Sequence, residues 1–80
     1  MKTVFITGAA SGIGLATARR FAAEGWLVGL YDLNEEMIEE HLKSPEFDQA
    51  CGGRCDVTSH DSVAQALQHF ADKTQGRMDV

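Results

Sequence analysis

The sequence predicts an α/β fold in which short strands and helices alternate around a parallel sheet. Apolar runs at residues 2–7 and 26–31 are typical of buried strands, and each is followed by a segment with helical spacing of apolar residues. Glycines gather at residues 8–14, where the first strand turns into the first helix. The order β-α-β-α-β-α requires right-handed crossovers and therefore predicts a doubly wound sheet.

Composition bounds the function classes. Eighty residues make at most one small domain, and a net charge of −5 gives no basic surface for nucleic acid. No apolar stretch approaches the length of a membrane span, and the N-terminus lacks a signal-peptide profile. We therefore expect a cytoplasmic protein with no membrane or nucleic-acid partner.

The first strand, 2–7, is short, β-branched and aromatic. The helix that follows is expected from Gly12 to Glu24, with Gly25 as its C-terminal cap. Its apolar face is predicted from the alanine-rich sequence to contain Ile13, Ala16, Phe21 and Ala22.

The second strand stops at Asp32, and its near-continuous apolar run suits a strand that is covered on both faces. Asn34 is the predicted N-cap of the second helix, which has glutamates early and Lys43 late, as the helix dipole favours. Ser44-Pro45 is expected to end that helix.

The third strand is expected over residues 50–57, mainly from its position, because Gly52 and Gly53 weaken its propensity. Ser59 opens a third helix whose apolar residues recur at helical spacing, and Gln75-Gly76 closes it. Residues 78–80 begin another apolar run, the expected start of a fourth strand. The predicted apolar face of the third helix consists of Val63, Leu67 and Phe70.

Two cysteines, Cys51 and Cys55, lie four positions apart in the segment expected to be extended. Such positions are about 13 Å apart, too far for a disulfide. The three histidines show no ligand-type spacing with these thiols, so we expect free cysteines and no metal site.

The octet TGAASGIG at residues 7–14 predicts a phosphate or pyrophosphate site, since backbone N–H groups and the helix dipole favour an anion at such a turn. Gly8 would allow the tight turn, Gly12 would leave room for the ligand, and Gly14 would permit close packing of helix on strand. No lysine follows Gly12, which excludes a P-loop. A purely structural glycine-rich turn remains the alternative.

Asp32 lies 18 residues beyond Gly14, where a dinucleotide fold places an acidic group on the ribose hydroxyls. Its carboxylate would repel a 2′-phosphate, and neither Leu33 nor Ser11 offers a positive charge. NAD is therefore predicted over NADP. The alternative is a carboxylate at a helix N-terminus with no ligand role.

Taken together, TGAASGIG, Asp32, the segment CDVT and the segment QGRMDV resemble the short-chain dehydrogenases/reductases. The resemblance implies a Rossmann-type fold and an NAD-dependent oxidoreductase that moves hydride between nicotinamide and a carbonyl/alcohol substrate. It also implies that Asp56 contacts the adenine amino group and that the Val57 N–H contacts the ring. The predicted cofactor-binding residues are Gly8, Ser11, Gly12, Ile13, Gly14, Asp32, Leu33, Asp56 and Val57.

The resemblance makes residues 1–80 the N-terminal, adenosine-binding half of an NAD(P)-binding Rossmann domain whose remainder is absent. The family's catalytic serine and Tyr-x-x-x-Lys pair have no counterpart here, and Tyr31, the only tyrosine, is expected inside a strand. These residues alone are thus predicted to be inactive, within a homo-oligomeric parent enzyme. The alternative is a non-catalytic module that binds only the ADP part of NAD.

Overall fold

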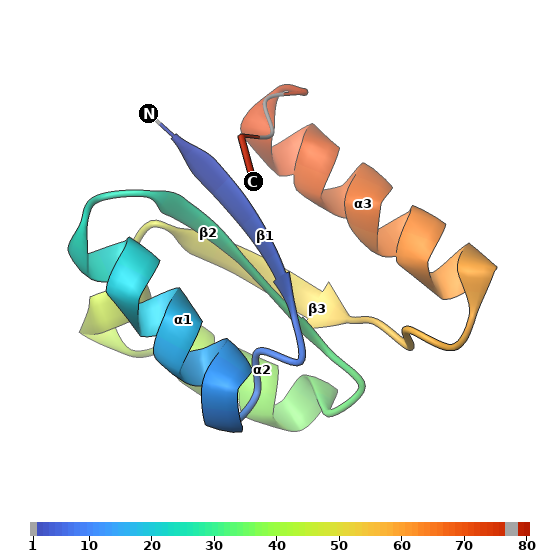
Figure 1. Cartoon of the computed structure of the whole chain (residues 1–80), viewed down its shortest axis with the longest axis horizontal. Coiled ribbons are helices and arrows are strands. Elements are labelled where there is room, and N and C mark those ends of the chain that lie inside the picture. Colours follow the sequence, from blue (N-terminus) through green and yellow to red (C-terminus); the bar gives the residue numbers. More distant parts are fainter. Residues whose placement is uncertain (1, 77–78) are drawn as a thin grey trace.

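The computed structural model describes residues 2–76 and 79–80, and its sheet confirms the predicted α/β class. Three parallel strands lie in the order β1 (Thr3–Thr7), β2 (Leu27–Asp32) and β3 (Ala50–Arg54). The register pairs Thr7 with Tyr31 and Asp32 with Arg54, so the carboxyl ends of the strands meet at one edge (Figure 1). In such sheets that edge is where ligands bind.

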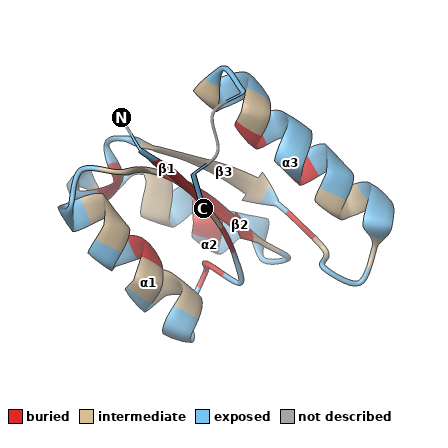
Figure 2. Cartoon of the chain, turned by 45° about the horizontal axis from the view of Figure 1, so that its top comes forward, coloured by how far each residue is buried: buried red, intermediate tan, exposed pale blue. Residues whose placement is uncertain are grey.

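Helices cover both faces of the sheet, as a doubly wound fold requires (Figure 1). Helices α1 (Gly12–Ala23) and α2 (Glu35–Leu42) lie on one face with the short 3₁₀ helix η1 (Pro45–Phe47), and α3 (His60–Thr74) lies on the other. Successive strand residues point to opposite faces, which divides the core in two. The first core contains Val4, Ile6, Val28, Leu30, Ile38 and Phe47, and the second contains Tyr31, Cys55, Ala66 and Phe70 (Figure 2).

Local capping signals were predicted correctly. The side chain of Asn34 accepts a hydrogen bond from the Met37 N–H at 3.2 Å, and the Ser59 hydroxyl accepts one from the Ser62 N–H at 3.2 Å. Gln75 ends α3 in the left-handed conformation at φ 58°. These bonds satisfy backbone donors that the first turn of a helix leaves free.

The third strand is shorter than predicted, because it ends at Arg54 and not at Val57. The N–H of Cys55 donates to the carbonyl of Asp32 at 2.9 Å, and the chain then turns toward α3. Position 52 requires glycine in this packing, because a Cβ there would lie 2.1 Å from the Leu30 carbonyl oxygen. Cys51 and Cys55 are both free thiols.

Two predicted apolar faces were partly wrong. In α1, Ile13 is 87% exposed and Ala16 is exposed, because the side that meets the sheet carries Leu15 and Ala18. In α3, Leu67 is 37% exposed, and its neighbour Ala66 is buried instead. One helical position turns a side chain by about 100°, so an error of one residue changes which side chains reach the core.

The edge of β1 opposite β2 is paired near the end of the chain. The N–H of Val80 donates to the Thr3 carbonyl at 3.1 Å, and the N–H of Phe5 donates to the Val80 carbonyl at 2.8 Å. Met78, with which the predicted fourth strand begins, lies outside the described residues. Within the described residues, no helix has the length and apolar character needed to cross a membrane.

Candidate functional site

A hollow of about 220 Å³ lies at the edge where the carboxyl ends of the strands meet. It brings together five of the nine predicted binding residues. They come from the turn after β1, the end of β2 with the residue that follows it, and the segment after β3. The other four predicted residues, Ser11 to Gly14, lie at the start of α1. The lining residues are Gly8, Asp32, Leu33, Cys55, Asp56, Val57 and Thr58.

The glycine loop, residues 7–14, leads from β1 into α1. It contains two residues in the left-handed conformation, Gly8 at φ 65° and Gly12 at φ 61°. Side chains other than glycine rarely adopt this conformation. A Cβ on Gly14 would lie 2.0 Å from the Gly8 carbonyl oxygen, so Gly14 permits the close packing predicted for it. A Cβ on Gly12 would meet open space, which leaves room beside the loop.

The N-terminus of α1 is left available for an anion. Its N-cap, Ser11, is exposed and makes no side-chain capping bond, and the first turn carries no acidic residue. The N–H groups of the first turn of α1 and the positive end of its dipole are therefore left to interact with an anion. Ile13, in the same turn, projects into solvent.

Asp32 is held by backbone donors on two sides. Its Oδ2 accepts from the Ala10 N–H at 3.0 Å, and its Oδ1 accepts from the Asn34 N–H at 2.9 Å. A carboxylate has about four lone-pair positions, so each oxygen can accept one further bond. Leu33, 57% exposed, lies beside it on the hollow.

Asp56 is fixed by Thr58, which sequence reasoning missed. Its Oδ1 accepts from the Thr58 hydroxyl at 2.6 Å and from the Thr58 N–H at 3.0 Å. Both bonds hold the pKa of Asp56 below its ordinary value, and the bond from the hydroxyl has the larger effect. The Asp56 N–H in turn donates to the Ser62 hydroxyl at 2.8 Å. The signal for Thr58 was present, because Asp-x-Thr is a common side-chain turn.

The site thus offers three kinds of contact to one ligand. Carboxylates of Asp32 and Asp56 accept hydrogen bonds, and the partly exposed side chains of Leu33 and Val57 give apolar contact. The start of α1 supplies N–H donors for an anion. An aromatic base, a sugar with free hydroxyls and a phosphate would each find a complementary group.

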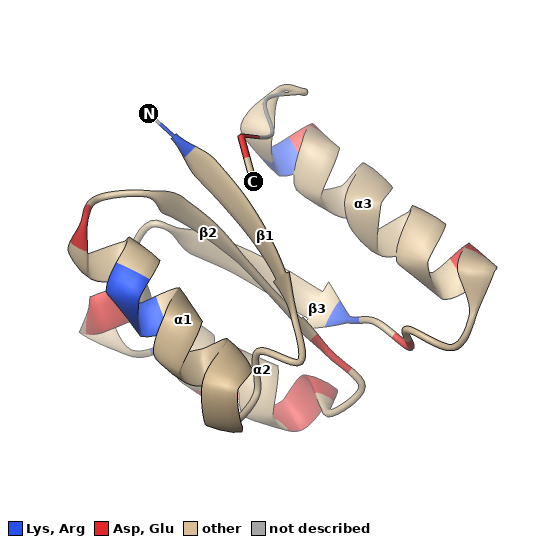
Figure 3. Cartoon of the chain, viewed as in Figure 1, with Lys and Arg blue, Asp and Glu red and all other residues tan. Residues whose placement is uncertain are grey.

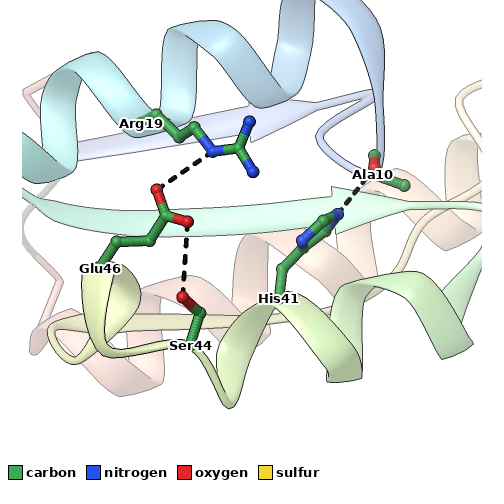
Figure 4. Close-up of polar contacts among 5 residues, drawn as sticks. All are labelled: Ala10, Arg19, His41, Ser44 and Glu46. Carbon is green, nitrogen blue, oxygen red and sulfur yellow. Dashed lines mark hydrogen bonds and ion pairs between the residues drawn. The ribbon is translucent and has the colours of Figure 1, made fainter.

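The arginines of α1 lie in its second half, away from its N-terminus, whereas Arg54 lies at the carboxyl end of β3 (Figure 3). Arg19 pairs instead with Glu46 of η1, at 3.1 Å between Nε and Oε1 (Figure 4). Arg20 lies 3.9 Å from Glu24 at the far end of the helix. Neither arginine is placed to bind an anion at Asp32.

Tyr31 does not belong to the site. Its ring is 1% exposed in the core, and its hydroxyl lies 2.7 Å from Nδ1 of His69. Burial raises the pKa of Tyr31 far above its ordinary value. This environment suits a structural tyrosine, as the sequence predicted.

Comparison with known proteins adds independent findings. The chain matches the family model described as short chain dehydrogenase over residues 2–80. Meso-2,3-butanediol dehydrogenase of Serratia marcescens is 40% identical over 79 residues, which cover 99% of this chain and 31% of that protein. Short-chain dehydrogenase reductase 5 of Arabidopsis thaliana is also 40% identical over 79 residues, covering 99% of this chain and 30% of that protein. The chain therefore spans about a third of the length of these relatives.

Solved structures agree with this result. An alcohol dehydrogenase from the archaeon Thermococcus sibiricus, complexed with 5-hydroxy-NADP, matches with a TM-score of 0.89 and 28% identity. The match covers 99% of this chain and 34% of that one. Actinorhodin polyketide ketoreductase with NADPH matches with a TM-score of 0.82 and 33% identity, over 90% of this chain and 28% of that one.

Proposed function

The chain belongs to the short-chain dehydrogenase family of oxidoreductases, and on this premise we propose that it holds the adenosine half of NAD for hydride transfer between nicotinamide and a carbonyl/alcohol substrate. Residues 1–80 would then be the N-terminal half of an NAD(P)-binding Rossmann domain. The hollow bounded by Asp32 and Asp56, beside the glycine loop, is the observation that carries the proposal.

The pyrophosphate is assigned to the start of α1. The left-handed Gly8 and Gly12 shape the turn, and the absence of a Cβ on Gly12 leaves space for the ligand. Backbone N–H groups in the first turn would donate to the phosphate oxygens, assisted by the helix dipole. Ser11 and Ile13 are the exposed side chains of this turn.

The adenosine is assigned to the hollow. Asp32 would accept from the ribose hydroxyls, while Leu33 and Val57 would contact the two faces or edges of the base. Asp56, which keeps its charge to a lower pH than an ordinary aspartate, would accept from the adenine amino group. The Val57 N–H would donate to the ring.

The preference for NAD over NADP rests on Asp32. A 2′-phosphate would bring its negative charge into contact with the negatively charged carboxylate of Asp32. The adjacent Leu33 is uncharged and would not offset the repulsion. Two matching structures were solved with NADP-type cofactors, one an analogue, so relatives of this chain accept a 2′-phosphate. The preference is thus a property proposed for this chain from its own residues.

When bound, NAD supplies the hydride-accepting nicotinamide ring. The chain's own residues would bind and orient the adenosine end of the cofactor and hold the carboxylate of Asp32 in place. The buried Tyr31 hydroxyl, bonded to His69, is not available to move a proton to a substrate. We therefore expect these 80 residues by themselves to bind without turnover, and we assign catalysis and self-association to a longer parent chain.

Calorimetric titration of the chain with ADP, AMP and NAD tests the proposal. We expect ADP and NAD to bind with similar affinity and AMP more weakly, because the assigned contacts end at the pyrophosphate. Absence of heat with all three ligands would refute the proposal. Much tighter binding of NAD than of ADP would contradict the assignment of only the adenosine half to these residues.

A further inference from the structure

His41 lies outside the hollow but contacts the glycine loop directly. It is the second-last residue of α2, and its Nε2 is 2.8 Å from the carbonyl oxygen of Ala10 (Figure 4). A carbonyl oxygen only accepts, so Nε2 of His41 carries the proton and donates it. His41 lies outside the segments TGAASGIG, CDVT and QGRMDV, and it is 31 positions from Ala10 in the sequence.

Among the described residues, three hydrogen bonds join the glycine loop to β2 and α2. The Ala9 N–H donates to the Tyr31 carbonyl at 3.2 Å, and the Ala10 N–H donates to Oδ2 of Asp32 at 3.0 Å. Both of these lead to β2. The bond from His41 is the attachment to α2, and it is the one that holds the carbonyl side of Ala10.

The orientation of this carbonyl fixes the next N–H. In a planar trans peptide, the Ala10 carbonyl and the Ser11 N–H point in opposite directions. Because His41 holds the carbonyl toward α2, the Ser11 N–H points away from α2. Ser11 is exposed at the N-terminus of α1, where the pyrophosphate has been assigned.

We propose that His41 is a positioning residue for the cofactor: by holding the Ala10 carbonyl, it orients the Ser11 N–H toward the phosphate. This inference rests on the proposed function, because it requires a phosphate-bearing ligand at the glycine loop. The side chain is half-buried, and its ring lies in a T-shaped arrangement with the Phe47 ring, at 6.4 Å between centroids.

A matched pair of variants tests the inference with ADP as the ligand. The amide nitrogen of glutamine in His41→Gln extends to about the position of Nε2, whereas the amide nitrogen in His41→Asn is one bond shorter and extends only to about the position of Nδ1. Both variants place a neutral amide at the same helical position. We expect His41→Asn to bind ADP about threefold to tenfold more weakly than the wild type, the range of one ordinary hydrogen bond, and His41→Gln to restore binding.

Equal ADP affinity of the wild type and His41→Asn would overturn the inference, even if the thermal midpoint of His41→Asn were lower. Equal weakening of both variants would overturn it too, because the donor at Nε2 would then not be the cause. If the wild type binds no ADP, the proposed function fails and the inference fails with it. A wild type that binds ADP alongside an unaffected His41→Asn would remove the inference alone.

A second measurement needs no variant and holds even if His41→Asn does not fold. The ¹⁵N shifts of the His41 ring report which nitrogen carries the proton in the neutral side chain. We expect protonated Nε2 and an ADP-dependent shift of the Ser11 amide resonance. A neutral ring protonated only at Nδ1 would contradict the bond to Ala10.

Discussion

The carboxylate of Asp32 accepts a hydrogen bond from the backbone N–H of Ala10, at 3.0 Å between Oδ2 and N. This bond joins the end of β2 to the glycine loop, 22 positions earlier in the sequence. The residue assigned to the ribose therefore also fixes the loop assigned to the pyrophosphate. A substitution at position 32 should disturb both contacts.

The substitution Asp32→Asn tests this dual role. Asparagine keeps one acceptor oxygen but loses the charge, so the bonds to the ribose and to Ala10 weaken together. Hydrogen bonds to charged groups contribute about 1.5–3 kcal/mol, which predicts at least a tenfold loss in NAD affinity. Calorimetric titration measures the change. An NAD dissociation constant equal to that of the wild type would remove Asp32 from the binding site.

The substitution Gly14→Ala should destabilise the fold. Its Cβ would lie 2.0 Å from the Gly8 carbonyl oxygen, a backbone atom that cannot move aside as the end of a flexible side chain could. We expect a loss of about 1–3 kcal/mol in the free energy of unfolding, the usual cost of overpacking. Urea denaturation measures it.

Gly53→Ala is the matched control, because its Cβ would meet the ring of Tyr31 at an ordinary 3.9 Å. Its effect on unfolding should be small. Similar losses in both variants would show that glycine is not specifically required at position 14.

These examples also show what the sequence could predict. The glycine turn, the caps at Asn34 and Ser59 and the acidic end of β2 are local signals, because each is specified by neighbouring residues. The predicted binding residues Asp32 and Asp56 come from different segments but share one hollow, since parallel strands end together. Family resemblance, and not spacing, singled out Asp56.

Other features depend on contacts between distant segments. The face of α1 that meets the sheet is set by the approach of Gly14 to Gly8, so Ile13 is exposed although it is apolar. The third strand ends at Arg54, after which the Cys55 N–H still donates to the Asp32 carbonyl of β2. Nothing near His41 in the sequence indicates its bond to Ala10, which exists only after α2 packs on the sheet.

The substitution Tyr31→Phe should reduce sensitivity to alkali. Burial raises the pKa of Tyr31 above its ordinary value of 10.0, so the unfolded chain loses this proton at a lower pH than the folded chain. Stability is therefore retained below about pH 10 and falls as the pH rises further, with a limiting slope of about 1.4 kcal/mol per pH unit.

Thermal unfolding of the wild type and of Tyr31→Phe, at about pH 8 and about pH 11, measures this difference. The variant should lose less stability between the two values. It retains Cys51 and Cys55, whose pKa values are raised mainly by burial, so some alkaline loss should remain. Identical losses in the two proteins would contradict the role of Tyr31.

The substitution Thr58→Val should raise the pKa of Asp56. It removes the hydroxyl donor, which is the larger cause of the lowered pKa, and keeps the backbone donor. Titration of the Asp56 carboxyl carbon by NMR measures the shift. Thr74→Val is the control, because the Thr74 hydroxyl donates to the Phe70 carbonyl and not to Asp56. An Asp56 pKa unchanged in Thr58→Val would refute this assignment.

Titration of the wild-type chain with NAD and with NADP tests the central claim most directly. The Asp32 carboxylate, with uncharged Leu33 beside it, should bind NAD at least about tenfold more tightly than NADP, a difference of about 1.4 kcal/mol or more. NADP binding that equals or exceeds that of NAD would contradict the assignment of Asp32 to the ribose hydroxyls.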